Sequence, residues 1–296
     1  MKIRLALTLI RLLSLLPLAA TDRIGQLLGS LAWRLPSRRR SVIETNLRIA
    51  FPQCSEAERQ RIHRQHLIEM ARLVLESGAV WYWSEQRILR RIVRVDGREH
   101  VDRARASGKG YLMVSAHLGN WEILNLWGSI EMPVVSLYKQ PSDPRLDPVI
   151  RRSRERFGAT LVASGSPAMR RILAQLRQGG CVGMMIDQQP KQGEGLFAPF
   201  FGHPALTMTL VRRLTRQTGC EVLLVSTHRL GRGRGWAISI EPADKAIADD
   251  DPLRSIRVLH DWLEDAIRAH PAQYLWSYKR YSLQPSENDP VYARRP

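Results

Sequence analysis

His117 and Glu122 are the residues of this chain whose types and spacing best suit catalysis. His117 directly follows the apolar run 111–116, which reads as a buried strand, and residues 120–130 read as a helix. Sites in α/β proteins are commonly built at such strand-to-helix turns. A neutral imidazole can remove a proton from an attacking hydroxyl near pH 7, and a carboxylate can hold its tautomer. We predict that His117 is a general base and that Glu122 orients its ring, although this spacing alone also occurs in structural pairs.

The segments that would position these residues alternate between strand and helix patterns. Strands are expected at residues 92–95, 111–116, 134–138, 181–186, 222–227 and 236–240. Helices are expected near residues 99–107, 121–130, 146–157, 167–178, 206–218 and 252–269. This alternation predicts an α/β fold with a mixed, mostly parallel central sheet that is covered by helices. The glycine-rich segment 231–235 is expected to be a hairpin loop.

The segment before this pattern is helical in character and begins with an apolar stretch. Residues 55–82 carry a helical apolar period, and Ser41 and Glu44 form a capping-box pattern ahead of a shorter helix. Arg11 and Pro17 interrupt the apolar stretch 5–20, which is shorter than the roughly 20 residues of an ideal membrane span.

We expect residues 1–33 to form a membrane anchor or interfacial helices and residues 34–296 to form the catalytic domain. Trp33 and the arginine cluster 38–40 would then lie at the level of the lipid headgroups. A cleaved signal peptide and a soluble core helix are the alternatives for the N-terminal segment.

The charge of the chain is strongly positive, with 45 Lys and Arg against 28 Asp and Glu, a net charge of +17. This balance suits an anionic membrane, an acidic protein or nucleic acid. The basic cluster beside an apolar segment favours lipid over nucleic acid. Three widely spaced cysteines argue against a disulfide framework or a structural zinc site and suit a reducing compartment. We expect neither a metal nor a cofactor, because His-Glu-x-x-His is absent, and no serine lies in a Gly-x-Ser-x-Gly elbow.

Five blocks, in order along nearly the whole chain, resemble the late lipid A acyltransferases (lauroyl/myristoyl type) of Gram-negative bacteria. This family lies within the glycerolipid acyltransferase superfamily, whose shared motif is His-x4-Asp/Glu. Several ordered blocks together are specific where each alone is not. The blocks are 115–122 (SAHLGNWE), 145–150 (RLDPVI) followed by Arg154, 184–189 (MMIDQQ), 198–202 (APFFG) and 273–280 (QYLWSYKR).

The resemblance implies an acyltransferase on the cytoplasmic face of the bacterial inner membrane. The donor would be an acyl chain on acyl carrier protein, and the acceptor a hydroxyl of a lipid A precursor, giving a secondary acyl ester. It also implies that Asp187 lines the site of His117. Arg154 and the groups that follow His117, up to Asn120, are expected to bind substrate or the oxyanion. The expected partners are acyl carrier protein, a phosphorylated glycolipid and an anionic membrane surface, and not nucleic acid.

Two alternatives remain open from the sequence. The acceptor could be another membrane glycolipid or aminolipid, with acyl-coenzyme A as the donor, which keeps the chemistry of His117. Alternatively, the chain could be a basic, membrane-attached binding protein without catalysis, in which case His117 would be dispensable.

Overall fold

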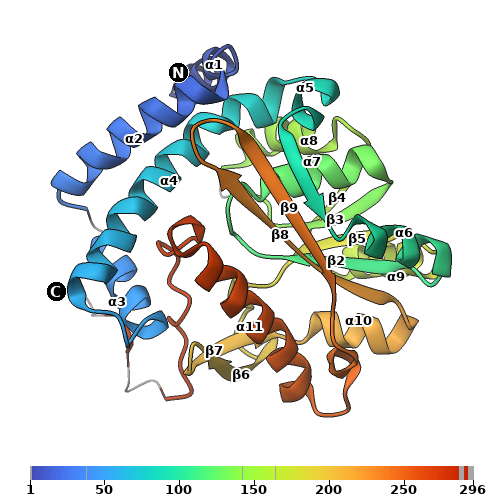
Figure 1. Ribbon diagram of the computed structural model, residues 1–296. Coiled ribbons are helices and arrows are strands. Elements are labelled where there is room, and N and C mark those ends of the chain that lie inside the picture. The colour runs from blue at the N-terminus through green and yellow to red at the C-terminus, as the bar shows by residue number, and fades with distance from the viewer. Residues whose placement is uncertain (1, 38, 142, 164, 287–289, 293–296) are drawn as a thin grey trace.

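A seven-stranded sheet forms the centre of the computed structural model, which describes residues 2–37, 39–141, 143–163, 165–286 and 290–292 (Figure 1). The order of strands across the sheet is β1-β9-β8-β2-β5-β3-β4. In the described residues, neighbouring strands run parallel, except that β8 and β9 are antiparallel. The strands are β1 (Ile92–Asp96), β2 (Tyr111–Ser115), β3 (Val134–Tyr138), β4 (Thr160–Ala163), β5 (Cys181–Met185), β8 (Glu221–Leu230) and β9 (Gly235–Pro242).

Alternate residues of the central strands enter two separate apolar clusters, because successive side chains of a strand point to opposite faces. On β2, Leu112 and Val114 join one cluster, whereas Tyr111 and Met113 join the other. Every residue of β2 is buried, as expected for a strand in the middle of a sheet that is covered on both faces. The α/β fold with a mixed, mostly parallel sheet, predicted from the sequence, is confirmed.

Helices on the two faces enclose these clusters (Figure 1). One face is covered by α3 (Arg40–Ala50), α9 (Ser166–Arg177), α10 (Leu210–Thr218) and α11 (Pro252–Ala269). The other is covered by α4 (Glu56–Tyr82), α5 (Glu85–Leu89), α6 (Arg98–Ser107) and α7 (Glu122–Glu131), with α8 (Asp147–Glu155) beside α7. Short 3-10 turns are η1 (Pro144–Leu146), η2 (Lys245–Ala248) and η3 (Pro271–Gln273).

The N-terminal residues form two helices, α1 (Lys2–Leu13) and α2 (Leu18–Arg34), with Pro17 at the N-cap of α2. Helix α2 packs closely along α4, because Gly25 and Gly29 lack side chains at the contact: a Cβ on Gly29 would lie 2.3 Å from the Cα of Ile68. None of the described helices is long and apolar enough to cross a membrane. A membrane-anchoring helix that spans the bilayer is therefore not supported.

Several local predictions differ from the structure. Helix α3 begins at Arg40 and has no side-chain cap, so the capping box expected at Ser41 is wrong, whereas Ser55 and Glu58 do form one at the start of α4. Two further strands, β6 (Gly195–Phe200) and β7 (His203–Met208), pair as an antiparallel hairpin where the sequence predicted no strand and a helix from residue 206. Pro199 and Pro204 made this region unlike a strand in the sequence, because proline cannot donate a backbone hydrogen bond. A strand with a free edge tolerates it.

Candidate active site

The register of the sheet brings His117 and Asp187 together. Ser115 and Met185, the last residues of β2 and β5, are paired across these parallel neighbours. Each is followed two residues later by a polar side chain, His117 and Asp187. The ring Nδ1 of His117 lies 2.8 Å from Oδ1 of Asp187, and the backbone N–H of His117 donates to Oδ2 at 3.1 Å. Both oxygens of one carboxylate therefore fix the histidine at the carboxyl edge of the sheet.

This pairing sets the tautomer and the basicity of the histidine. Asp187 is only 2 % exposed, and its carboxylate accepts a hydrogen bond from Nδ1–H of His117, which leaves Nε2 as the basic nitrogen. Burial alone would lower the pKa of His117, but the negative charge and hydrogen bond of Asp187 outweigh it and raise that pKa above the usual 6.5. Burial would raise the pKa of Asp187, yet His117 keeps it below its usual value.

The orienting role predicted for Glu122 is filled by Asp187 in the structure. Glu122 begins helix α7, which directs its carboxylate towards α8, where Arg154 holds it with two parallel hydrogen bonds. The Nε–Oε2 distance of this pair is 2.8 Å. The negative charge of Glu122 still acts on His117 and contributes to its raised pKa. Glu122 and Arg154 thus form a second polar pair beside the histidine, with part of the guanidinium exposed.

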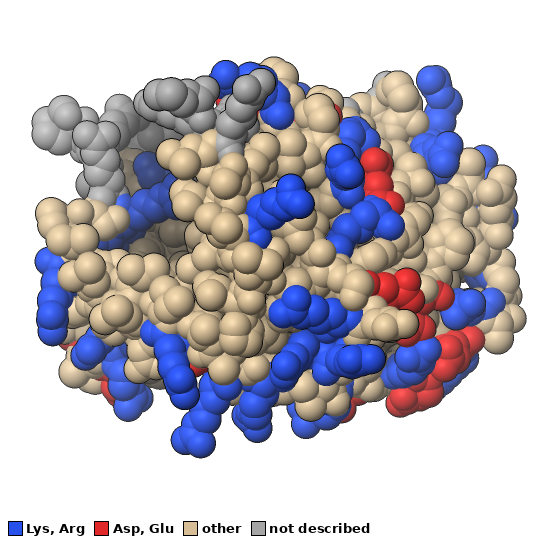
Figure 2. All heavy atoms as spheres, turned by 90° about the horizontal axis from the view of Figure 1, so that it is seen from above, with Lys and Arg blue, Asp and Glu red and all other residues tan. Residues whose placement is uncertain are grey.

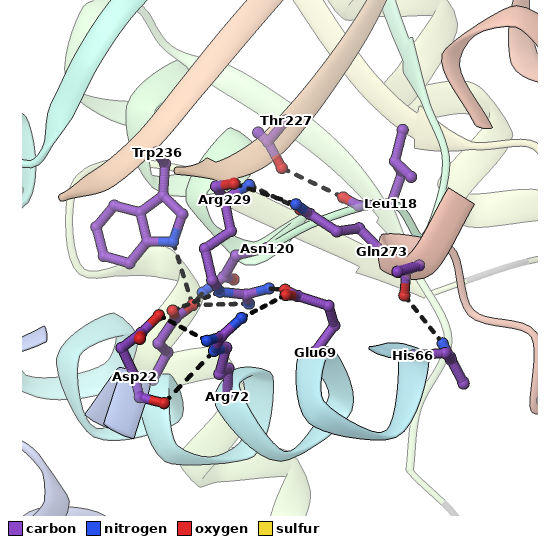
Figure 3. Close-up of polar contacts among 12 residues, drawn as sticks. Asp22, His66, Glu69, Arg72, Leu118, Asn120, Thr227, Arg229, Trp236 and Gln273 are labelled. Carbon is purple, nitrogen blue, oxygen red and sulfur yellow. Dashed lines mark hydrogen bonds and ion pairs between the residues drawn. The ribbon is translucent and has the colours of Figure 1, made fainter. Parts of the chain in front are cut away.

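The side chain of Asn120, a predicted substrate contact, binds within the protein in this structure. It is fully buried and donates from Nδ2 to Oε2 of Glu76 at 2.8 Å (Figure 3). The first backbone N–H groups after His117 are also occupied, because Leu118 donates to Ala116 and Gly119 to Gln273. These two amides and Nδ2 of Asn120 are therefore already paired with protein acceptors in this conformation.

Two residues that the sequence did not single out adjoin the histidine ring. The amide Nε2 of Gln188 lies 3.4 Å from Nε2 of His117, the ring nitrogen that Asp187 does not contact. The ring of Trp121 lies edge-on to the imidazole, with 4.9 Å between the ring centroids. Both residues adjoin predicted site residues in the chain, Asp187 and Glu122, and that adjacency was the available signal.

The loop that carries His117 is held between β8 and the C-terminal segment. Leu118 forms an isolated bridge with Tyr274, and its carbonyl accepts from the Thr227 hydroxyl at 3.2 Å (Figure 3). Gly119 has φ +63°, and a Cβ there would lie 2.3 Å from the carbonyl oxygen of Thr227. Only glycine suits this position, because a side chain would meet both backbone strain and a clash. Contacts with β8 and with the C-terminal segment thus fix the conformation of the loop.

The comparisons with known proteins agree with this geometry. Residues 2–282 match the model of the family described as bacterial lipid A biosynthesis acyltransferase. The chain is 25% identical over 278 residues to the lipid A biosynthesis palmitoleoyltransferase of Escherichia coli K12, covering 94% of this chain and 90% of that protein. It is 26% identical over 271 residues to the lipid A biosynthesis lauroyltransferase of the same organism, covering 91% of this chain and 88% of that protein. A phosphatidylinositol mannoside acyltransferase of Mycobacterium tuberculosis H37Rv is 27% identical over 216 residues, covering 65% and 64%.

A buried acid holds the histidine at the carboxyl ends of the strands, and the relatives of the chain are acyltransferases. Together these observations identify the class of the protein as an O-acyltransferase. The chain belongs to the bacterial lipid A biosynthesis acyltransferase family, as the resemblance of its five blocks predicts.

Proposed function

We propose that the protein transfers a fatty acyl chain from acyl carrier protein to a hydroxyl of a lipid A precursor, forming a secondary acyl ester. The observation that carries this proposal is the pairing of Nδ1 of His117 with buried Asp187, which leaves Nε2 as the basic nitrogen, with only the long contact to the amide of Gln188. The names of the relatives, which are lipid A lauroyl-, palmitoleoyl- and myristoyltransferases, support the acceptor. The net charge of +17 suits an acidic carrier protein and a phosphorylated glycolipid.

The reaction needs one base and no covalent enzyme intermediate. Nε2 of His117 removes the proton of the acceptor hydroxyl as the oxygen attacks the thioester carbonyl carbon. The carbonyl oxygen becomes an oxyanion, and Asp187 stabilises the imidazolium that has formed. When the tetrahedral intermediate collapses, the C–S bond breaks and the thiolate takes the proton from the imidazolium. The products are the ester and the free thiol of the carrier.

Arg154 and Gln188 are the proposed donors for the oxyanion or for a substrate phosphate. Arg154 keeps guanidinium N–H groups beyond the two that bind Glu122, and it lies beside the histidine with part of its surface exposed. The amide of Gln188, next to Nε2 of His117, can turn to the carbonyl oxygen once a hydroxyl occupies that nitrogen. Glu122 then acts through Arg154, by fixing the plane of the guanidinium.

Arg154→Lys is expected to lower kcat/KM by about 10- to 100-fold, even though it keeps the charge. Lysine cannot form the two parallel bonds to Glu122, so the donor would lose its fixed orientation. Steady-state acyl transfer by the purified variant measures this effect. The matched control is Arg257→Lys on α11, whose guanidinium pairs with Asp261 on the exposed surface and should tolerate the change. Equal rates for Arg154→Lys and the wild type would remove Arg154 from the mechanism.

We also propose that α1 and α2 lie on the inner membrane as interfacial helices, with the site on the cytoplasmic face. The exposed apolar side chains of these helices recur at helical spacing. They are Leu5, Leu9, Leu12 and Leu15 from α1 and the following turn, and Leu27, Leu28, Leu31 and Leu35 from α2 and its C-cap. Figure 2 shows the molecule from above, where Lys and Arg are spread over the face and Asp and Glu lie mostly to one side. Such leucines beside basic residues suit the interface of an anionic bilayer.

The double substitution Leu9→Asp and Leu12→Asp is expected to weaken vesicle binding by at least about 10-fold. Each leucine contributes about 1.5–3 kcal/mol when its side chain leaves water, and an aspartate is also repelled by anionic lipid. Co-sedimentation with vesicles that contain phosphatidylglycerol measures the change. Leu253→Asp on α11, an exposed leucine outside these two helices, is the control and should bind as the wild type does. Point substitutions are preferable to truncation, because Leu18 and Thr21 of α2 are buried.

Acyl transfer by the full chain in detergent tests the proposed function. Acyl carrier proteins loaded with C10 to C16 chains are supplied with a Kdo-bearing tetra-acyl lipid A precursor, and the products are read by mass. One added acyl group establishes reaction, donor and chain length together. A product only with acyl-coenzyme A and phosphatidylinositol mannoside would favour the acceptor class of the mycobacterial relative. Lipid binding without turnover, with His117 dispensable, would favour a binding protein.

A further inference from the structure

A buried network of charged side chains lies directly beneath the loop that carries His117 (Figure 3). Its carboxylates come from α2 and α4, and its guanidiniums from α4 and β8. The members are Asp22, Glu69, Arg72, Glu76 and Arg229, joined by ion pairs with N–O distances of up to 3.1 Å. Glu69, Arg72, Glu76 and Arg229 are each less than a tenth exposed. Neither the catalytic steps nor the apolar clusters account for these charges.

Glu76 is the point at which this network meets the active-site loop. Its Oε1 accepts from Nε of Arg229 at 2.6 Å. Its Oε2 accepts from Nη2 of Arg229 at 2.9 Å, from the indole of Trp236 at 3.1 Å and from Nδ2 of Asn120 at 2.8 Å. Asn120 lies three residues after His117 and two before Glu122. The carboxylate of Glu76 therefore connects Asn120, in the loop that carries His117, to α4, β8 and β9.

Arg229 fixes the same loop by a second route. Its backbone N–H donates to Oε1 of Gln273 at 2.7 Å, and its carbonyl accepts from Nε2 of Gln273 at 3.1 Å. The carbonyl of Gln273 in turn accepts from the N–H of Gly119, at 3.1 Å. Arg229 is thus connected to two consecutive residues of the loop, to Asn120 through its guanidinium and Glu76, and to Gly119 through Gln273.

The orientation of Asn120 is imposed by this contact. Turning its amide over would place the carbonyl oxygen against the carboxylate of Glu76, so Nδ2 must face Glu76 and Oδ1 must face away. Oδ1 is buried and has no hydrogen-bond partner, which is unfavourable for folding. Buried ion pairs likewise add little stability over apolar residues of similar size. The arrangement is better explained by a need for a fixed loop position than by a gain in stability.

We propose that Glu76 and Arg229 are positioning residues that hold His117 and Glu122 in place through Asn120. This inference rests on the acyl transfer proposed above. Asn120 acts as the tether: its loss leaves the side chains of His117 and Glu122 in the fold but lets the loop shift relative to Asp187, which follows β5. A displacement of about 1 Å at a catalytic group can cost as much as 100-fold in rate.

The test compares two isosteric substitutions in the same buried network. Glu76→Gln removes the charge that holds Asn120, whereas Asp22→Asn removes a carboxylate at the far end, on α2, where it contacts Arg72 and not the loop. Asn120→Ala removes the tether itself. If the alanine variant does not fold, Asn120→Ser is used in its place, because a serine side chain is too short to reach Glu76. We expect Glu76→Gln and Asn120→Ala to lower kcat by about 10- to 100-fold with KM within about twofold. Asp22→Asn should stay within about twofold of the wild type.

A second readout does not depend on turnover. Histidine-selective ¹⁵N labelling gives the tautomer and pKa of His117, whose signals are identified by their loss in His117→Gln. The groups that act on this ring are Asp187, Glu122 and Arg154. A loosened contact with Asp187 weakens the interaction that raises the pKa. We therefore expect this pKa to fall by about half a unit or more in Asn120→Ala and to stay unchanged in Asp22→Asn.

The outcomes separate this inference from the proposed function. Unchanged kcat and unchanged His117 pKa in both Glu76→Gln and Asn120→Ala would overturn it. Equal losses in all three variants, with the His117 pKa unmoved, would reduce the network to a general stabiliser and would also overturn it. If the wild-type protein transfers no acyl group from any donor, the proposed function is wrong. The His117 pKa in the variants then tests the positioning role by itself. A double variant that combines Glu76→Gln with Asn120→Ala and is no slower than Glu76→Gln alone would show that both residues act on His117 through the same contact.

Discussion

Replacement of His117 by alanine is expected to lower kcat/KM for acyl transfer by at least about 100-fold, the usual contribution of a general base. A secondary hydroxyl is too weakly acidic to attack a thioester without losing its proton, and the proposed base is Nε2 of His117, the ring nitrogen that Asp187 does not contact. Initial rates of the folded variant, with the acyl donor that serves the wild type, measure the loss.

The control for this prediction is His100→Ala on α6, a histidine whose polar neighbours are Glu99, at 3.9 Å, and Arg103, at 3.4 Å, on the same helix. It should retain the wild-type rate. Near wild-type turnover by a correctly folded His117→Ala protein would contradict the base mechanism. Together with lipid binding, that result would instead favour the non-catalytic alternative.

Asp187→Asn is expected to reduce kcat/KM by about 10²- to 10⁴-fold, although the side chain keeps its size. An amide can present N–H groups to Nδ1 of His117, which favours the tautomer that carries its proton on Nε2. A protonated Nε2 cannot accept the proton of the acceptor. The control is Asp261→Asn, an exposed isosteric change on α11 that breaks only a surface pair with Arg257.

The pH profile of the same variant gives an independent check. Activity requires neutral His117, so kcat/KM rises with pH through the pKa of His117, which in the wild type lies above 6.5. Without the carboxylate of Asp187, burial is left to lower that pKa, and the midpoint of the acid limb should move to lower pH. A variant with full activity and an unmoved midpoint would show that Asp187 does not govern the basicity of His117.

The sequence by itself determined the class of fold and the position of the proposed base. Apolar runs and amphipathic stretches were enough to predict an α/β sheet, because the period of burial is a local property of the chain. His117 was recognisable because it follows the strand Tyr111–Ser115 directly. The same reasoning placed Asp187 after another strand, β5, but gave no means of knowing that β2 and β5 are neighbours.

The tertiary structure decided which acid serves the histidine. Glu122 is near His117 along the chain, yet helix α7 directs it to Arg154, whereas Asp187 is remote in sequence and reaches Nδ1. Strand order and register select between these carboxylates, and both depend on contacts between distant segments. Asn120 shows the same limit: its residue type suits a substrate contact, and only the packing of α4 against β8 and β9 places Glu76 beneath it. Local pattern fixes which residues end a strand, but pairing between strands decides which of those residues meet.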